Sequence, residues 1–370
     1  MVNNNEFRKI GIVTYHKSFN YGALLQSIAS RYILNELGYD AYYVDYWPRY
    51  HERIYSLFEK EKILTWNLYK SIKYLLYRFK MYGQLKKRYV HIKQFISVYI
   101  EPYCKPASDN FDCIIYGSDQ IWRKQPMTGM YNPVYFGCNN FHTKRNVSYA
   151  ASMGILPDND EDKEYIRDLL SHLDKISVRE NDLLSLVHTL GYKGEVNIDP
   201  TLLLKKEQWE QLIPRTENTR GKYVLHINWI HNSFLETEIQ KIAKSRGCKV
   251  IEMYQYVNRN ESDTFINSAN PAEFVNLIRN ADFVFTSSFH GLVFSIIANR
   301  PFYASFRINA GRGRSILETL GLSKYLLKPN SSIDVVYDLP DYNDVNLKLI
   351  EYRKRSIDYL KSISYEISMS

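Results

Sequence analysis

The stretch that decides the fold is KIGIVTYHKSFNYGALLQSIASRYILNELGYDAYYVDY, from Lys9 to Tyr46. Its first seven residues are mostly apolar, as in a strand that is buried on both faces of a parallel sheet. After a polar loop, apolar residues recur at near-helical spacing up to Gly38, which fits a helix C-cap, and DAYYVDY resumes strand character. A strand, a helix and a second strand in this order predict a right-handed βαβ unit.

The same alternation continues through both halves of the chain. Further strands are expected at FDCIIYGSD, RNVSYAASMG and KISVRE in the first half, and at KYVLHIN, KVIEMYQY, DFVFTSS and PFYASF in the second. A change of composition with Pro214 and Gly221 indicates a hinge between the halves. We therefore predict an α/β protein with two Rossmann-like, doubly wound domains facing a cleft, at residues 1–215 and 216–340, followed by a C-terminal helix at 341–370.

Composition narrows the class of protein. The chain has 370 residues, of which 45% are hydrophobic and 24% charged, which fits a globular protein and excludes a disordered one. Its four cysteines lack C-x-x-C spacing, and no carboxylate cluster has ligand spacing, so we expect neither a disulfide framework nor a metal site. Without a signal-peptide core or a long apolar span, we expect a cytoplasmic protein. The net charge of +8 favours anionic partners, but no RNA- or DNA-binding motif is present, so nucleic acid is not expected.

A basic insert interrupts the α/β pattern at residues 49–100. Between residues 60 and 95, ten Lys or Arg residues stand against the single acidic Glu61. Apolar residues recur there at steps of four, four, three and four, which predicts an amphipathic helix or helix pair: Leu64, Leu68, Ile72, Leu75 and Phe79. Two interpretations stay open. The insert docks on anionic lipid at the inner face of the cytoplasmic membrane, or it is a solvated, core-packed helix pair.

Ligands of open α/β sheets bind beyond the carboxyl ends of the strands, and this rule selects two loops in the first half. In the loop Ser18–Ala23, Gly22 opens a helix N-terminus to an anion, or simply forms a tight turn. In the loop Gly117–Trp122, Asp119 either binds sugar hydroxyls, acts as a base or caps a helix. The candidate ligand-binding residues of the two loops are Asn20, Tyr21, Gly22, Gln120 and Trp122, the last as a stacking platform.

Cationic and proton-transferring residues follow other strands. Arg179 lies where a strand meets a helix, and its guanidinium fork either grips a carboxylate or phosphate or pairs with neighbouring acids. His290 follows an apolar strand and is either a proton donor or a structural histidine. The other candidate anion-binding residues are Ser287, Ser288 and Gly291 beside that histidine, and Arg307, Arg312 and Arg314 in a glycine-containing stretch that is expected to form a flexible cationic loop.

Six motifs in order give the chain a family resemblance. They are NYGALLQ (20–26), GSDQIW (117–122), YAASMG (149–154), SVRE (177–180), DPTLLL (199–204) and SFHGLVFSII (288–297). Together they resemble the polysaccharide pyruvyl transferase family across roughly residues 9–322. The resemblance implies a fold similar to that of the two-domain GT-B glycosyltransferases, with a cleft between paired Rossmann-like halves.

The resemblance also implies an activity. The family transfers pyruvate from phosphoenolpyruvate to two hydroxyls of a sugar in a polysaccharide or its lipid-linked precursor, forming a cyclic ketal and releasing phosphate. Phosphoenolpyruvate would be a co-substrate, with no further cofactor. By resemblance His290 is the general acid, Arg179 and Arg314 hold the donor, and Asp119 is our candidate base. The resemblance likewise places the other anion-binding candidates on the donor side and the candidates of the two first-half loops on the acceptor side. Ser288 stands where many members carry arginine, so a donor-binding cation is expected at Arg307 or Arg312.

Two other functions remain open from the sequence. A nucleotide-sugar glycosyltransferase of the same architecture is expected to carry an acidic element late in the second domain. In this chain, residues 307–319 of that region contain several arginines and a single acidic residue, Glu318. A non-catalytic sugar-binding relative would explain Ser288 as the mark of a decayed site. Galactose, glucose and N-acetylmannosamine-type sugars all stay open as acceptors.

Overall fold

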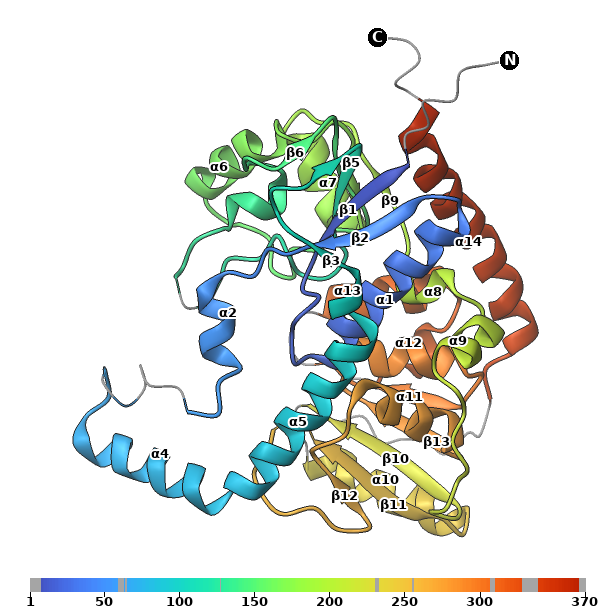
Figure 1. Cartoon of the computed structure of the whole chain (residues 1–370). Helices are drawn as coiled ribbons and strands as arrows, with labels where there is room; N and C mark the ends of the chain where they lie inside the picture. Colours follow the sequence, from blue (N-terminus) through green and yellow to red (C-terminus); the bar gives the residue numbers. More distant parts are fainter. Residues whose placement is uncertain are drawn as a thin grey trace.

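Two parallel five-stranded sheets form the frame of the protein (Figure 1). The computed structural model describes residues 8–58, 63, 65–126, 128–229, 233–254, 256–306, 310–327 and 339–365. The first sheet has the order β3-β2-β1-β5-β7 and the second the order β12-β11-β10-β13-β14. The strands of the first are β1 (Lys9–Val13), β2 (Asp40–Val44), β3 (Cys104–Lys105), β5 (Cys113–Tyr116) and β7 (Asn146–Ser148). Those of the second are β10 (Tyr223–Asn228), β11 (Lys249–Tyr254), β12 (Phe265–Ile266), β13 (Phe283–Thr286) and β14 (Phe302–Ala304).

Both sheets have the strand order of a Rossmann-like fold, which confirms the predicted α/β class with two such units. In each sheet the chain first adds strands on one side of the first strand, out to one edge of the sheet. It then crosses back and adds the later strands on the other side of that first strand. The switch point therefore lies between β1 and β5 in the first sheet and between β10 and β13 in the second. Two further strand pairs, β4 (Asn110–Phe111) with β6 (His142–Thr143) and β8 (Ser177–Val178) with β9 (Glu195–Val196), accompany the first sheet. The limits 1–215, 216–340 and 341–370 of the domains stay predictions.

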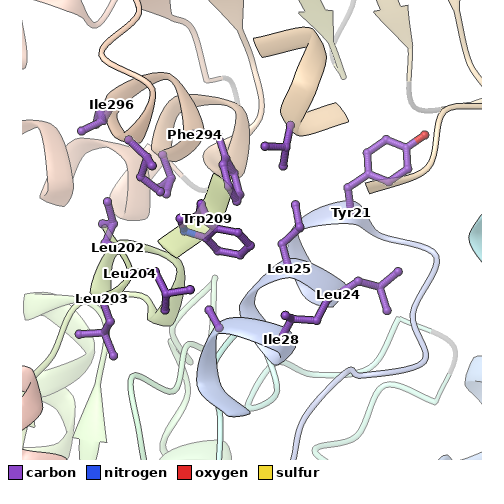
Figure 2. Close-up of a cluster of buried hydrophobic side chains, with 14 of the residues drawn as sticks. Tyr21, Leu24, Leu25, Ile28, Leu202, Leu203, Leu204, Trp209, Phe294 and Ile296 are labelled. Atoms are coloured by element: carbon purple, nitrogen blue, oxygen red, sulfur yellow. The ribbon is translucent and has the colours of Figure 1, made fainter. Parts of the chain in front are cut away.

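One continuous hydrophobic core joins the two halves. Helix α1 (Tyr21–Glu36) is buried along most of its length because it packs against helices of both halves: α8 (Pro200–Leu203), α11 (Pro271–Asn280) and α12 (Phe289–Ile297). Figure 2 shows Leu25 of α1 facing Trp209 of α9 (Lys206–Leu212) and Phe294 of α12, with Leu24 and Ile28 on the same helix. The two switch points are thus held together by apolar packing rather than by a linker alone.

The C-terminal helix α14 (Tyr342–Tyr365) also bridges the halves (Figure 1, red). At its start, the Tyr342 hydroxyl donates to the carbonyl oxygen of Arg300 in the second half. Near its end, the Tyr359 hydroxyl donates to the carbonyl oxygen of Ser148 in the first half (2.8 Å). Outside the insert, the other helices of the described residues are α6 (Asp160–Leu170), α7 (Asn181–Thr189), α10 (Ser233–Ser245) and α13 (Ala310–Thr319). Short 3₁₀ turns lie at Glu101–Tyr103, Pro133–Phe136 and Ser323–Tyr325.

The insert at residues 49–100 is helical where the structure describes it. It contains α2 (Arg49–Ile54), α4 (Leu68–Lys80) and α5 (Tyr82–Tyr99). Helix α5 packs its buried Ile92, Phe95 and Ile96 against the core, whereas α4 extends away from the body (Figure 1). Leu64 lies outside the described residues. Among the described helices, none is both long enough and apolar enough to cross a membrane.

Two buried histidines in the first half predict a loss of stability in mild acid. Burial lowers the pKa of His16 to about 4 and that of His51 to about 3. The unfolded chain therefore binds more protons than the native state below about pH 6.5, so stability falls as the pH drops from there toward 4. Each histidine contributes up to about 1.4 kcal/mol per pH unit. Urea unfolding across this range checks the slope; His51→Gln should flatten it, and the exposed His188→Gln should not.

Candidate active site

The loops that follow the two switch points face one another across a cavity of about 170 Å³. Its walls come from both halves of the chain, as expected for a ligand site at the carboxyl ends of parallel strands. The first half contributes Tyr15, Ser18, Asn20, His51, Tyr55, Asp119, Gln120 and Arg123. The second half contributes Trp229, Ser287, Ser288, Phe289, His290, Phe306, Arg312 and Gly313. The cavity is therefore an interdomain site lined by aromatic, hydroxyl and charged groups.

His290 enters this site from the first turn of α12. Ser288 caps the helix, its Oγ accepting a hydrogen bond from the backbone N–H of Gly291 (3.3 Å). Gly291 is required because a Cβ there would lie 2.2 Å from Thr286 Oγ1. The Ser287 hydroxyl accepts from the backbone N–H of Trp229 (2.8 Å). Both serine side chains thus hold the backbone that presents His290.

A buried carboxylate lies behind the histidine. Asp199 Oδ2 is 3.7 Å from His290 Nε2, and the same oxygen accepts from Arg179 Nη1. Asp199 Oδ1 accepts from the backbone N–H (3.0 Å) and the hydroxyl (2.6 Å) of Thr201 at the start of α8. Burial alone would raise the pKa of Asp199, but His290 and Arg179 outweigh it and hold that pKa well below its usual range. The aspartate is therefore a fixed negative charge that can orient His290.

Gly22 gives the histidine its space. A methyl group added at Gly22 would lie 1.8 Å from Nδ1 and 2.3 Å from Cγ of His290. The N–H groups of Gly22 and Ala23 both donate to Oδ1 of Asn20, which caps α1 (2.9 and 3.3 Å). Gly22 is thus a close-approach position between the halves, and its N–H is already engaged within the cap rather than free for an anion.

The Gly22→Ala variant should therefore displace His290. We expect it to destabilise the protein by about 1–3 kcal/mol, as overpacked core positions do, and to impair any activity that needs the histidine. Gly83→Ala is a matched control, because no atom lies within 4 Å of a Cβ built there, and it should leave stability unchanged or slightly raised. Chemical unfolding of the two variants measures the difference. Equal stability of the two would show that the close approach is not constraining.

Two arginines flank the ring of Phe289. The guanidinium carbon of Arg179 is 4.8 Å from the ring centroid, and that of Arg312 is 5.5 Å from it. Arg312 Nη1 also lies 3.8 Å from Asp119 Oδ1. Burial and the neighbouring Arg179 lower the pKa of Arg312 to about 10, so it remains a cation at neutral pH. Among the described residues, Arg179 Nη2 and Arg312 Nε have no hydrogen-bond partner and can donate to an anionic ligand.

Glu180 balances this positive charge. Its Oε1 accepts from Ser152 Oγ (2.7 Å) and from Arg179 Nε (3.3 Å), and only 5% of the residue is exposed. Burial raises the pKa of Glu180 despite the nearby arginines. A second cavity of about 180 Å³ adjoins the first, with Phe289 and Arg312 in the walls of both. The cationic groups are therefore accessible from two sides of one aromatic ring.

Comparison with known proteins assigns this arrangement to a family. The family model for polysaccharide pyruvyl transferase matches residues 20–305. The chain belongs to the polysaccharide pyruvyl transferase family. Its members are transferases. The match includes the loop around Gly22, the Asp199 turn and the His290 helix start, which are the elements that meet at the site. No curated protein matches the chain.

Solved structures resemble the chain only distantly. The UDP-N-acetylglucosamine 2-epimerase from Rickettsia bellii is 13% identical, with 99% of this chain and 100% of that chain covered and a TM-score of 0.46. The UDP-GlcNAc 2-epimerase from Methanocaldococcus jannaschii is 12% identical, with 92% and 91% covered and a TM-score of 0.45. Anabaena HepE in complex with UDP and glucose is 9% identical, with 99% and 100% covered and a TM-score of 0.42. At these identities and TM-scores the likeness carries no argument, and the Rossmann-like fold follows from the strand order of the two sheets.

The structure brings together most of the residues predicted for a pyruvyl transferase site. Seven line the first cavity: Asn20, Asp119, Gln120, Ser287, Ser288, His290 and Arg312. Gly22, Arg179 and Gly291 lie directly behind it. Arg307 falls outside the described residues. Their roles toward donor and acceptor remain predictions.

Three predicted residues need correction. Trp122 is fully buried, stacked on Phe136 and donating to the carbonyl oxygen of Tyr135 (2.9 Å), so it cannot stack on a sugar. Tyr21 is buried under the insert, where its hydroxyl accepts from Arg88 (2.8 Å). Arg314 is exposed and lines neither cavity.

The correction of Arg314 has a geometric cause. The stretch that was expected to be a flexible cationic loop forms helix α13 (Ala310–Thr319). Residues two apart on a helix are rotated by about 200° around its axis, so their side chains lie on nearly opposite sides. Arg312 therefore faces Phe289 and Asp119, while Arg314 faces solvent.

Three functional candidates were missed from the sequence. Asp199 stands in one of the six family motifs, but its proline-containing turn gave no sign that the carboxylate would meet His290. Arg123 lines the cavity and lies 5.9 Å above the Tyr15 ring, directly after the GSDQIW motif. His51, from the insert, lines it as well, and no periodic or spacing signal marked it.

Proposed function

We propose that the protein transfers the pyruvyl group of phosphoenolpyruvate to two hydroxyls of one sugar, forming a cyclic ketal and releasing phosphate. The observation that carries the proposal is the His290–Asp199 pair, which lies with Arg179 and Arg312 at two adjoining cavities between the halves. A small, densely charged donor needs fixed cations, and its vinyl carbon needs a proton donor. His290 and Arg312 line the first cavity, and Arg179 lines the adjoining cavity that shares Phe289 and Arg312 with it.

Arg179 and Arg312 are the proposed donor clamps. Each has a guanidinium nitrogen without a partner among the described residues, and both guanidinium groups lie over the ring of Phe289. Carboxylate and phosphate oxygens are the acceptors that such forks bind most strongly. We assign to Arg312 the charge that many family members carry as arginine at the position of Ser288, because the serine hydroxyl is uncharged and caps α12.

The proposed chemistry begins with His290 as general acid. The imidazolium gives its proton to the methylene carbon of the enol, and a sugar hydroxyl oxygen bonds to the adjacent carbon, which develops positive charge. The hydroxyl proton passes to a base, the carbon–oxygen bond to phosphate breaks, and the second hydroxyl closes the ketal and loses its proton. Asp199, which lies 3.7 Å from Nε2, fixes the orientation of the His290 ring through the reaction.

The acceptor is proposed to lie against the first half of the chain. Asp119 has a backbone φ of +73°, which directs its carboxylate toward Arg312, and it remains our candidate base. Gln120, Arg123, Tyr15 and Asn20 offer donors and acceptors around it. The partner is a saccharide, and presentation on a lipid carrier at the membrane is part of the proposal.

Product mass tests this function. The purified protein is incubated with phosphoenolpyruvate and a panel of galactose, glucose and N-acetylmannosamine glycosides, and products are analysed by mass spectrometry. Pyruvyl transfer adds the mass of pyruvate less one water to the acceptor and releases one phosphate. In parallel, nucleotide sugars replace phosphoenolpyruvate. A glycosylated product with release of nucleotide would replace this function with that of a glycosyltransferase, and binding without any product would indicate a sugar-binding relative.

A further inference from the structure

Helix α4 carries a stripe of exposed apolar side chains. Leu68 is 77% exposed, Ile72 48%, Leu76 65% and Phe79 67%, and Tyr69 beside them is 74% exposed. Steps of four, four and three residues place the first four on one side of a helix. Single exposed apolar residues are common on protein surfaces, but a continuous stripe along a whole helix marks an interaction surface.

The stripe is not the side by which α4 is attached to the protein. Ser71, on another side of the helix, is buried and donates to the carbonyl oxygen of Ile63 (3.1 Å). The Tyr77 hydroxyl donates to the carbonyl oxygen of Val257, and Arg78 donates to that of Ser56 (3.1 Å). Figure 1 shows α4 extending from the body beyond α5. Of the stripe, Phe79 lies against Phe58 (5.7 Å between ring centroids) yet keeps 67% of its surface exposed. The helix is thus held in place while most of its apolar stripe stays exposed.

Charge identifies the occupant of this surface. From Thr65 to Ile100 the chain contains eight Lys or Arg residues and no Asp or Glu. Lys73 and Lys80 flank the stripe on the side of Tyr69, and both are exposed. Two copies of α4 placed face to face would bring like charges together, whereas an anionic surface complements them. Apolar side chains bordered by lysines are the pattern of a helix that lies in a membrane interface.

We propose that α4 docks on an anionic phospholipid surface, with Leu68, Ile72, Leu76 and Phe79 inserted among the acyl chains and the flanking lysines among the headgroups. The inference rests on α4 alone and stands whether or not phosphoenolpyruvate is the donor. It selects the membrane-docking interpretation of the basic insert and assigns it to one helix face. Docking would hold the cavity near acceptors that are carried on lipid.

Vesicle co-sedimentation of the full chain tests the docking. We expect binding to phosphatidylcholine vesicles that contain phosphatidylglycerol and none to phosphatidylcholine alone. Ile72→Glu/Leu76→Glu should lower the partition coefficient about tenfold or more. Ile155→Glu, at a position that is 71% exposed elsewhere in the first half, should change nothing. Raising salt from about 0.1 M to about 1 M should weaken binding, because the Debye length falls from about 10 Å to about 3 Å.

The other outcomes would overturn the proposal. Unchanged binding by Ile72→Glu/Leu76→Glu would show that the stripe is not inserted, and equal binding to neutral vesicles would remove the role of charge. If the original protein were a dimer in sedimentation velocity without vesicles, and Ile72→Glu/Leu76→Glu were a monomer, the stripe would bind a second copy of the chain. RNA that binds at the same salt and needs the same stripe would make nucleic acid the occupant. Ile72→Ser/Leu76→Ser should show the same loss of vesicle binding without added negative charge. Melting curves of all variants check that each one is folded.

Discussion

Replacing His290 with glutamine should lower turnover by about 10²- to 10⁴-fold, the usual contribution of a general acid. The side chain lies beside the cavity with Nε2 3.7 Å from Asp199 Oδ2, so glutamine fills similar space but cannot deliver a proton. Because Arg179 and Arg312 are the proposed donor clamps, phosphoenolpyruvate should still raise the melting temperature of this variant. Turnover is measured as phosphate release with the acceptor that the product screen identifies.

His188→Gln is the matched control for His290. It removes an exposed histidine from the last turn of α7 and should leave turnover unchanged. If His290→Gln kept turnover within a few fold of the original protein, the proton would have to come from another group. If it abolished the melting shift as well, His290 would be binding the donor rather than protonating it.

Replacing Arg179 with alanine should destabilise the protein by about 3–5 kcal/mol, the cost of breaking a buried ion pair from one side. Only 4% of its side chain is exposed, and its removal leaves the buried carboxylates of Asp199 and Glu180 without their main cation. The same variant should lose the stabilisation by phosphoenolpyruvate. Urea unfolding and ligand-dependent melting measure the two effects.

Two controls separate charge from packing at Arg179. Combining Arg179→Ala with Asp199→Asn removes both partners and should recover part of the lost stability. Arg167→Ala breaks an exposed pair with Glu164 (2.9 Å) and should cost less than about 1 kcal/mol. An Arg179→Ala protein as stable as the Arg167→Ala protein would mean that the buried network does not hold the site together.

The sheet frame was predictable because its signals are local. The Lys9–Tyr46 stretch contains a strand, a helix and a strand. The crossover connection between two parallel strands of this kind is almost always right-handed. The rule that ligands bind at carboxyl ends of strands then selected Asp119 and His290. Both lie in the same cavity, although they belong to different sheets.

The misses depend on contacts between distant segments. Asp199 meets His290 because α8 packs between α1, α12 and α14, which no local pattern records. Trp122 looks like a sugar platform in sequence, but its indole stacks on Phe136. Tyr21 is covered by Arg88 from the insert. Side-chain direction after a strand end therefore needs the packing of neighbouring elements, and sequence spacing alone does not supply it.

The most direct test of the account is the melting temperature of the purified protein with phosphoenolpyruvate and, separately, with nucleotide sugars. A ligand at about one hundred times its dissociation constant adds roughly 2.7 kcal/mol of stability. The account predicts that phosphoenolpyruvate raises the melting temperature, that nucleotide sugars do not, and that Arg312→Ala removes the effect while Arg314→Ala leaves it. Stabilisation by a nucleotide sugar and not by phosphoenolpyruvate would contradict the proposed donor.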